Sequence, residues 1–186
     1  MSLYSRQNYF KIGEVFKVKE LFVVVDMQYD FIDGALGSPH ARQIVPYVIS
    51  AVKAARGRCA EVVFTKDTHE TNYLSTQEGK YLPIAHCIRG THGWDILSEV
   101  FLRGARIFEK STFGSVGLAE YAKAGQFKTI TFCGVCTDIC VVSNALLLKS
   151  YCPEAKIVVL PSACAGTNEE NHLAALKTMR NCQINV

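Results

Sequence analysis

The sequence predicts a single α/β domain built on a doubly wound, Rossmann-like sheet, mostly parallel and flanked by helices. Three observations lead to this prediction. The chain has 186 residues, of which 49% are hydrophobic and 20% are charged, which suits one domain with a sizeable core. Short apolar runs rich in β-branched residues recur along it, as strands buried in a parallel sheet require. Helical patterns separate these runs, and that alternation is typical of a doubly wound sheet.

The elements follow in order after a mixed segment at 1–20, which we interpret as an N-terminal extension of a domain spanning 21–186. The run "LFVVVD" at 21–26 is the first predicted strand. Further strands are predicted at 61–65, 129–133 and 156–160, with weaker candidates at 105–109 and 183–186. Helices are predicted at 41–56, 94–102, 117–124, 139–150 and 169–180. The chain contains no internal repeat or linker, so we predict no further domain boundary.

Charge and hydropathy exclude several classes of partner. The net charge is only +3, and the basic residues are scattered, which argues against a nucleic-acid partner. No apolar run approaches the length of about 18 to 20 residues that a membrane span needs. The N-terminus has no apolar stretch suited to a signal peptide, so we expect a cytoplasmic protein. Eight cysteines are too few for a disulfide scaffold of this size, and we expect reduced thiols.

Polar residues follow the predicted strands at the edge of the sheet where ligands bind. The first strand ends at Asp26, and the second runs into Asp67 and His69 in "TKDTHE". The candidate strand at 105–109 leads into Lys110, and the strand at 129–133 leads into "GVCTDIC". An acid, an acid with a histidine, a lysine and a thiol therefore converge at one edge of the sheet.

Cys140 is the best placed of three cysteines in the segment 131–150. Gly134 allows a tight turn after the strand, and Thr137 or Asp138 is a suitable cap for the helix that follows. Cys140 then lies in the first helical turn, where free backbone N–H groups lower a thiol pKa and can hold an oxyanion.

Two other interpretations of these cysteines stay open. A metal or iron–sulfur cluster is disfavoured because the spacing C-x2-C-x3-C supplies only three thiolates where such sites usually need four ligands. A redox pair of Cys133 and Cys136 is a minor possibility, because such pairs normally open a helix and do not straddle a strand end. A cysteine taken alone is more often a packed, inert thiol.

Asp26 and Lys110 supply what a nucleophilic thiolate needs, namely a proton acceptor and a positive neighbour. Either residue alone is better explained as a turn or surface residue. Together with Cys140 they form a coherent candidate for nucleophilic catalysis.

A second candidate group consists of Asp67, His69, Glu78 and His86. The D-x-H spacing directs Asp67 and His69 to one side of an extended segment, and the loop after them can fold Glu78 and His86 back. Two imidazoles and one or two carboxylates suit a divalent zinc, iron or manganese ion. The alternative is a set of ordinary polar loop residues. The remaining histidines, His40, His92 and His172, have no such neighbours, and we interpret them as surface or helix residues.

The chain resembles the isochorismatase-like cysteine hydrolases, and among them the nicotinamidases. The motifs that carry the resemblance are "VVVDMQYDFIDG", "KDTHE", "LPIAHCIRGTHG", "FEKSTFGS" and "GVCTDICV", which occur in the family's order from residue 21 onward. The isochorismatases lack the D-x-H set, which is why the resemblance favours an amide hydrolase.

The resemblance implies an isochorismatase-like fold, a triad at Asp26, Lys110 and Cys140, and a metal site at Asp67, His69 and His86. Glu78 matches a fourth ligand found in some nicotinamidases. A cis peptide before Cys136 would turn its N–H toward the oxyanion beside that of Cys140, and Phe31 would pack on a flat substrate ring. Trp94 follows a glycine turn, and we favour a packing role for it.

The resemblance also implies a small-molecule carboxamide substrate, a nicotinamidase reaction through a Cys140 thioester, and a homo-oligomer. Acid, lysine and thiol do not encode the acyl group, so another amidase or a ureido-acid hydrolase is the alternative. A non-enzymatic alternative is a metal-binding, redox-sensing domain that uses Cys133 and Cys136.

Overall fold

The fold is a five-stranded parallel sheet with helices on both sides, as predicted. A computed structural model describes residues 19–186; the predicted extension falls almost entirely outside the described residues. The strands are β1 (Glu20–Val25), β2 (Glu61–Asp67), β3 (Arg106–Lys110), β4 (Thr129–Val135) and β5 (Lys156–Ala165). They lie in the order β3-β2-β1-β4-β5, and every neighbouring pair is parallel.

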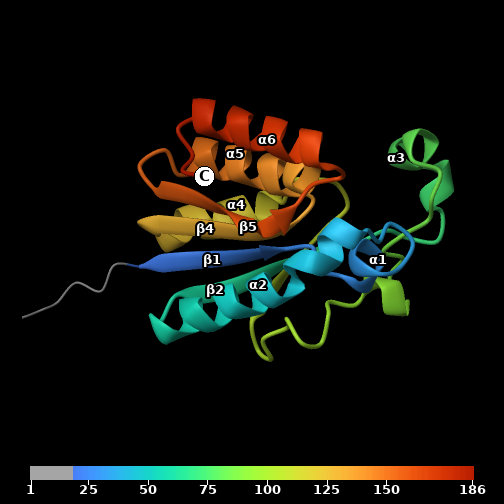
Figure 1. Ribbon diagram of the computed structural model, residues 1–186, viewed down its shortest axis with the longest axis horizontal. Coiled ribbons are helices and arrows are strands. Elements are labelled where there is room, and N and C mark those ends of the chain that lie inside the picture. Colours follow the sequence, from blue (N-terminus) through green and yellow to red (C-terminus); the bar gives the residue numbers. More distant parts are fainter. Residues whose placement is uncertain (1–18) are drawn as a thin grey trace, which may run out of the picture.

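Helices lie between successive strands, and one more helix follows the last strand. The longer ones are α2 (Pro39–Gly57), α4 (Val116–Gly125), α5 (Val142–Tyr151) and α6 (Glu169–Asn181). The short ones are α1 (Tyr29–Ile32), α3 (Gln77–Tyr81), η1 (Tyr73–Ser75), η2 (His92–Trp94) and the π-helical turn η3 (Thr137–Val141). In Figure 1, α2 lies below the strands and α5 and α6 lie above them. Within residues 19–186, no helix has the length and apolarity needed to cross a bilayer.

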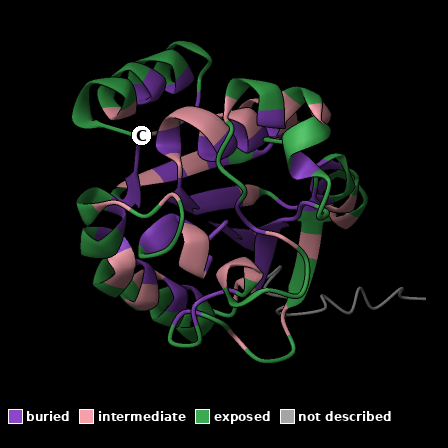
Figure 2. Cartoon of the chain, turned by 90° about the vertical axis from the view of Figure 1, so that its right-hand side faces the viewer, coloured by how far each residue is buried: buried purple, intermediate pink, exposed green. Residues whose placement is uncertain are grey.

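The core is centred on the middle strands. Every residue of β1, β2 and β4 after the first is buried, which explains the apolar runs at 21–25 and 62–64 and the small number of polar residues in β4. Figure 2 looks at the molecule from the side toward which the strands point in Figure 1, and shows these buried strands enclosed by helices with exposed outer faces. The carboxyl ends of the strands therefore meet in one place, beside α1 and α3.

One predicted helix is absent from the structure, and one predicted strand is only a single bridge. Residues 94–102 do not form a helix, although Ile96, Leu97 and Val100 are buried at helix-like spacing. The Leu97 N–H donates to the Met27 carbonyl at 2.9 Å, and Ile96 pairs with Gln28 in an isolated antiparallel bridge. This tertiary pairing replaces the hydrogen bonds of a helix. The C-terminal segment 183–186 contributes only a single bridge to β5, between Asn185 and Val158, and is not a strand.

Candidate active site

Asp26 lies at the carboxyl end of β1 and is fully buried. Its φ of 48° is in the left-handed region, which short polar side chains tolerate. The Thr65 hydroxyl accepts the Asp26 backbone N–H at 3.2 Å and donates to Oδ1 at 2.6 Å, which fixes the carboxyl group. Burial raises the pKa of Asp26, and the Lys110 ammonium opposes that shift.

Lys110, at the end of β3, brings three groups together. Its Nζ lies 2.7 Å from Asp26 Oδ2, 3.0 Å from Asp67 Oδ1 and 3.5 Å from Cys140 Sγ. Burial alone lowers a lysine pKa, but the charges of Asp26, Cys140 and Asp67 outweigh it and raise the pKa of Lys110 well above its usual value. The side chain is therefore a permanent cation in the middle of the site.

The contact between Lys110 and Asp26 Oδ2 is an ion pair without good hydrogen-bond geometry. Among the described residues, this oxygen has no hydrogen-bond partner, although the ammonium lies 2.7 Å away. The 2.7 Å ion pair still stabilises both groups, because a charge–charge attraction does not depend on the angle. Asp26 Oδ2 consequently has lone-pair capacity to accept a proton.

Cys140 lies in η3, directly before α5, with its side chain 6% exposed. The predicted position in the first helical turn is confirmed. Burial and the nearby Asp26 carboxylate raise the pKa of the thiol well above its usual value, and Lys110 opposes this. The resting thiol is therefore neutral, so it needs a base at the moment it reacts.

The turn before Cys140 differs from the predicted cap. Cys136 is the cap residue and makes no side-chain capping bond, while Thr137 and Asp138 bond elsewhere. The Thr137 hydroxyl lies 2.9 Å from His172 Nδ1 in α6, and Asp138 accepts the N–H of Thr167 at 2.9 Å. The turn is thus fastened to α6 and to the loop that precedes it.

The three clustered cysteines occupy three different environments. Cys133 is fully buried in β4, and Cys136 is half-buried after a Val135–Cys136 peptide that is cis, as the resemblance implied. Burial raises the pKa of Cys136 to about 12, which makes it a poor nucleophile. All eight cysteines of the chain are free thiols in the structure.

Gly134 lies within β4, and not in a turn after the strand as predicted. Its φ is 117°, and a Cβ built on it would lie 2.1 Å from the Val25 carbonyl oxygen. The close approach of β1 and β4 beneath Cys140 therefore requires glycine at this position.

The predicted metal ligands Asp67, His69, Glu78 and His86 come together at the ends of β2 and α3. One donor atom from each residue lies within 4.8 Å of all the others. Asp67 Oδ2 lies 3.0 Å from His69 Nε2 and 3.5 Å from His86 Nε2. Glu78 Oε1 lies 3.6 Å from His69 Nε2 and 3.9 Å from His86 Nε2.

This donor set fits a divalent ion. Ligand atoms about 2.0 to 2.1 Å from a tetrahedral zinc ion are about 3.3 Å apart, close to the spacings in the site. His86 Nδ1 lies 2.8 Å from the Ile84 carbonyl, which fixes the ring and leaves Nε2 facing the other ligands. Burial disfavours the Asp67 carboxylate, but hydrogen bonds from His69 and His86 and the charge of Lys110 outweigh it and lower its pKa.

Sequence reasoning missed the residue that fixes the backbone of this site. The buried Gln28 side chain donates to the Asp67 carbonyl at 2.8 Å and to the Trp94 carbonyl at 2.9 Å, and it accepts the Asp67 N–H at 2.7 Å. Trp94 itself donates to the Thr68 hydroxyl at 2.9 Å and so has the structural role that was predicted for it. Gln28 gave no signal because its partners are backbone groups.

Two cavities meet at the metal ligands. We call the first the thiol cavity: it has a volume of about 270 Å³ and is lined by Cys140, Cys136, Phe31, Phe113 and the ligands Asp67, Glu78 and His86, among others. Phe31 lies edge-on to His86, with ring centres 5.7 Å apart. Phe31 therefore lines the same cavity as the thiol, and its packing on a substrate ring stays a prediction.

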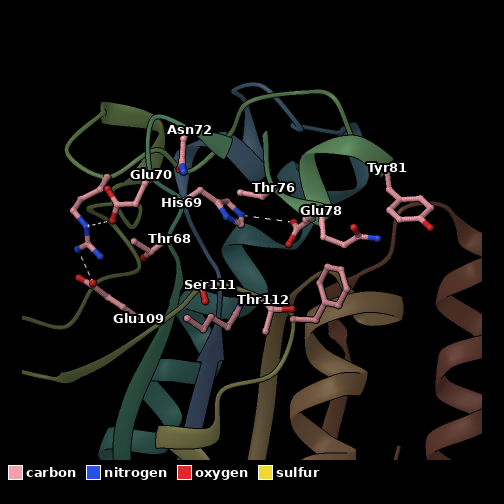
Figure 3. Close-up of a pocket in the computed structure, with 14 residues that line it drawn as sticks. Thr68, His69, Glu70, Asn72, Thr76, Glu78, Tyr81, Glu109, Ser111 and Thr112 are labelled. Carbon is pink, nitrogen blue, oxygen red and sulfur yellow. Dashed lines mark hydrogen bonds and ion pairs between the residues drawn. The ribbon is translucent and has the colours of Figure 1, made fainter. Parts of the chain in front are cut away.

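We call the second the polar cavity, with a volume of about 940 Å³. Figure 3 shows His69 and Glu78 turned toward each other in it, with Ser111 and Thr112 below them. Its lining is rich in hydroxyl, amide and carboxylate groups and includes Thr68, Glu70, Asn72, Thr76, Arg89, Glu109 and Lys110.

Comparison with known proteins identifies relatives along nearly the whole described chain. The family model described as "Isochorismatase domain" matches residues 20–186. A Bacillus subtilis isochorismatase family protein is 28% identical, with 88% of this chain and 96% of that protein covered. The zinc complex of a Pyrococcus horikoshii pyrazinamidase superimposes with a TM-score of 0.80 at 29% identity, covering 90% and 97% of the two chains. A Streptococcus mutans pyrazinamidase/nicotinamidase gives a TM-score of 0.81 at 25% identity, covering 90% and 99%.

Proposed function

We propose that this chain, which belongs to the isochorismatase family and is an amidohydrolase, is a metal-dependent nicotinamidase that hydrolyses nicotinamide to nicotinate and ammonia. One observation carries the proposal. Lys110 Nζ contacts Asp26, Asp67 and Cys140, so an acid, a cation, a thiol and a ligand set converge beside one small cavity.

The first step forms the nucleophile and the carbon–sulfur bond. Asp26 takes the proton of the neutral Cys140 thiol as the sulfur attacks the carboxamide carbon. Lys110 stabilises the negative charge on the Cys140 sulfur and the negative charge on the Asp26 carboxylate. The N–H groups of Cys136 and Cys140 hold the oxygen of the tetrahedral adduct.

The second step breaks the carbon–nitrogen bond and regenerates the thiol. Asp26 returns its proton to the leaving nitrogen, so ammonia departs and an acyl thioester of Cys140 remains. Asp26 then accepts a proton from the attacking water, the carbon–sulfur bond breaks, and the sulfur leaves as the thiol with that proton. The raised pKa of Asp26 suits this exchange, because it moves a carboxyl group toward neutral pH.

The divalent ion would be held by Asp67, His69, Glu78 and His86. Zinc is our first choice for the ion, and iron and manganese are the alternatives. The ion supplies a Lewis acid for the pyridine nitrogen of the substrate. The protein's own part is orientation: His86 and Phe31 form adjacent walls of the thiol cavity, so a ring that packs on Phe31 directs its edge at the ligand set.

The lining of the thiol cavity favours a neutral aromatic amide over a ureido acid. Its walls are largely apolar, with Leu36, Leu82 and Ile139 beside the two phenylalanines, and none of the described residues that line it is a lysine or an arginine. The carboxylate of a ureido acid would have no lysine or arginine partner there and would compete with Asp67 and Glu78 for the metal ion. A volume of about 270 Å³ also suits a single-ring ligand, because cavities for drug-sized molecules run from about 300 Å³ upward.

The test is ammonia release from nicotinamide by the purified chain, with nicotinate identified as the second product. Cys140→Ala should lower the rate by about 10⁴-fold or more, whereas Cys136→Ser should retain most of it, because its contribution comes through the backbone. Full activity of Cys140→Ala contradicts the mechanism. Turnover of N-carbamoyl amino acids without nicotinamide turnover favours the ureido-acid alternative.

The non-enzymatic alternative has its own signature. Bound metal without any amide turnover, together with a reversible Cys133–Cys136 disulfide, would favour a redox sensor. The homo-oligomer implied by the family resemblance remains a prediction, which light scattering can check.

A further inference from the structure

The polar cavity is not used by the proposed reaction, yet it contacts the same ligand set as the thiol cavity. His69 and Glu78 line the polar cavity, whereas Asp67, Glu78 and His86 line the thiol cavity. The four ligands therefore separate two cavities, and Glu78 contributes to both.

The ligands differ in how accessible they are. The side chains of Asp67 and His69 are 6% exposed and that of His86 is 2% exposed, but the side chain of Glu78 is 20% exposed. Glu78 is therefore the ligand that an arriving ion can reach first. Figure 3 shows its carboxylate facing His69 across the polar cavity.

The walls of the polar cavity suit a cation that still carries water. The amide of Asn72 and the hydroxyl groups of Ser111 and Thr112 can replace water ligands one at a time. The thiol cavity offers mostly hydrocarbon in comparison, and an ion passing through it would lose hydration without compensation.

The charged residues of the polar cavity are paired with one another. Arg89 is held between Glu70 at 2.9 Å and Glu109 at 2.7 Å, so its charge is shared by two carboxylates. Besides the ligand Glu78, the described lining has the carboxylates of Glu70 and Glu109 and the cations Arg89 and Lys110, so an arriving ion meets no net repulsion.

We propose that the divalent ion reaches and leaves its ligands through the polar cavity, while the thiol cavity serves the substrate. This inference rests on the proposed metal site. The ion and the substrate then enter by separate routes, and the ion exchanges without passing through the position where the substrate binds.

The first experiment follows zinc release from the loaded full-length chain into an excess of a chromogenic chelator. Asn72→Trp places an indole on the wall of the polar cavity, and Leu36→Trp is its matched control on the wall of the thiol cavity. We expect Asn72→Trp to slow release several-fold. Leu36→Trp should leave release unchanged and instead lower kcat/KM for the amide. The reverse pattern would overturn the proposal.

A second experiment uses charge and does not depend on how the tryptophan variants fold. Association of Co²⁺ with the metal-free chain is followed by its absorption at low ionic strength. Glu109→Gln should slow association and Arg89→Gln should accelerate it, and both differences should shrink as salt is added. Equal rates in the two variants overturn the route. A wild-type chain that binds no stoichiometric metal overturns the metal part of the proposed function as well, so the two failures are distinguishable.

Discussion

Replacing Gln28 with alanine should destabilise the fold and weaken metal binding together. The side chain makes two hydrogen bonds to the backbone of Asp67 and one to that of Trp94. Alanine removes all three, and leaves the N–H and C=O of Asp67 unpaired at a position that is 4% exposed. Each buried polar group left without a partner costs about 1 to 3 kcal/mol, so we expect a loss of about 2 to 5 kcal/mol.

The loss is large compared with a typical domain stability of about 5 to 15 kcal/mol. Urea denaturation of the metal-free chain measures it, and Gln43→Ala on the exposed face of α2 is the control, expected within about 0.5 kcal/mol of the parent. Gln28→Glu keeps the acceptor for the Asp67 N–H but puts a carboxylate oxygen against two carbonyl groups, so it should be no better tolerated than alanine.

The second readout is the zinc affinity of Gln28→Ala. Because Gln28 holds the residue that carries a ligand, its loss should weaken zinc binding by about 10- to 100-fold, as removal of an outer-shell partner typically does. Isothermal titration on the folded variant checks this. An unfolding free energy within about 0.5 kcal/mol of the parent, with unchanged zinc affinity, would refute the role of Gln28 as the clamp between β1 and β2.

Three further substitutions test separate parts of the site. Lys110→Met leaves the Asp26 and Asp67 carboxylates without their shared cation, and kcat should fall by about 10²- to 10⁴-fold in the ammonia-release assay; an unchanged kcat contradicts the assigned role. Glu78→Gln removes the most exposed ligand, so zinc affinity should fall about tenfold or more while the stability of the metal-free chain stays within about 0.5 kcal/mol; affinity equal to the parent excludes Glu78 as a ligand. Gly134→Ala forces a Cβ against the Val25 carbonyl at a φ of 117°, and should lower the free energy of unfolding by about 2 to 4 kcal/mol in thermal denaturation. The control is Gly57→Ala, where a Cβ meets nothing within 4 Å and the free energy of unfolding should not fall.

The catalytic and metal residues could be found from the sequence because a parallel sheet places all its strand ends at one edge. Asp26, Lys110 and Cys140 follow three different strands, and the topology alone brings them within contact distance. The strand lengths were less predictable. Strands β2 and β4 extend through Asp67 and Val135, because the register with their neighbours continues past the apolar runs.

Features that depend on distant backbone groups were not predictable from the sequence. The spacing of Ile96, Leu97 and Val100 is compatible with a helix, and only the Met27 carbonyl, far away in the chain, decides against one. Gln28 likewise shows no periodicity that separates a buried clamp from a loop residue. In both cases the deciding partner is a main-chain group, which carries no side-chain signature.

Asp67 connects the catalytic residues with the candidate metal ligands, because one of its carboxylate oxygens faces each group. Oδ1 lies 3.0 Å from the Lys110 ammonium, while Oδ2 faces His69 and His86. An ion held at Oδ2 would draw negative charge away from Lys110, which would then be compensated mainly by Asp26. Since a less compensated cation stabilises a thiolate better, the ligand set can activate Cys140 without touching it. The shared carboxylate thus gives a physical reason for the proposed metal site next to a thiol that already has its own acid and lysine.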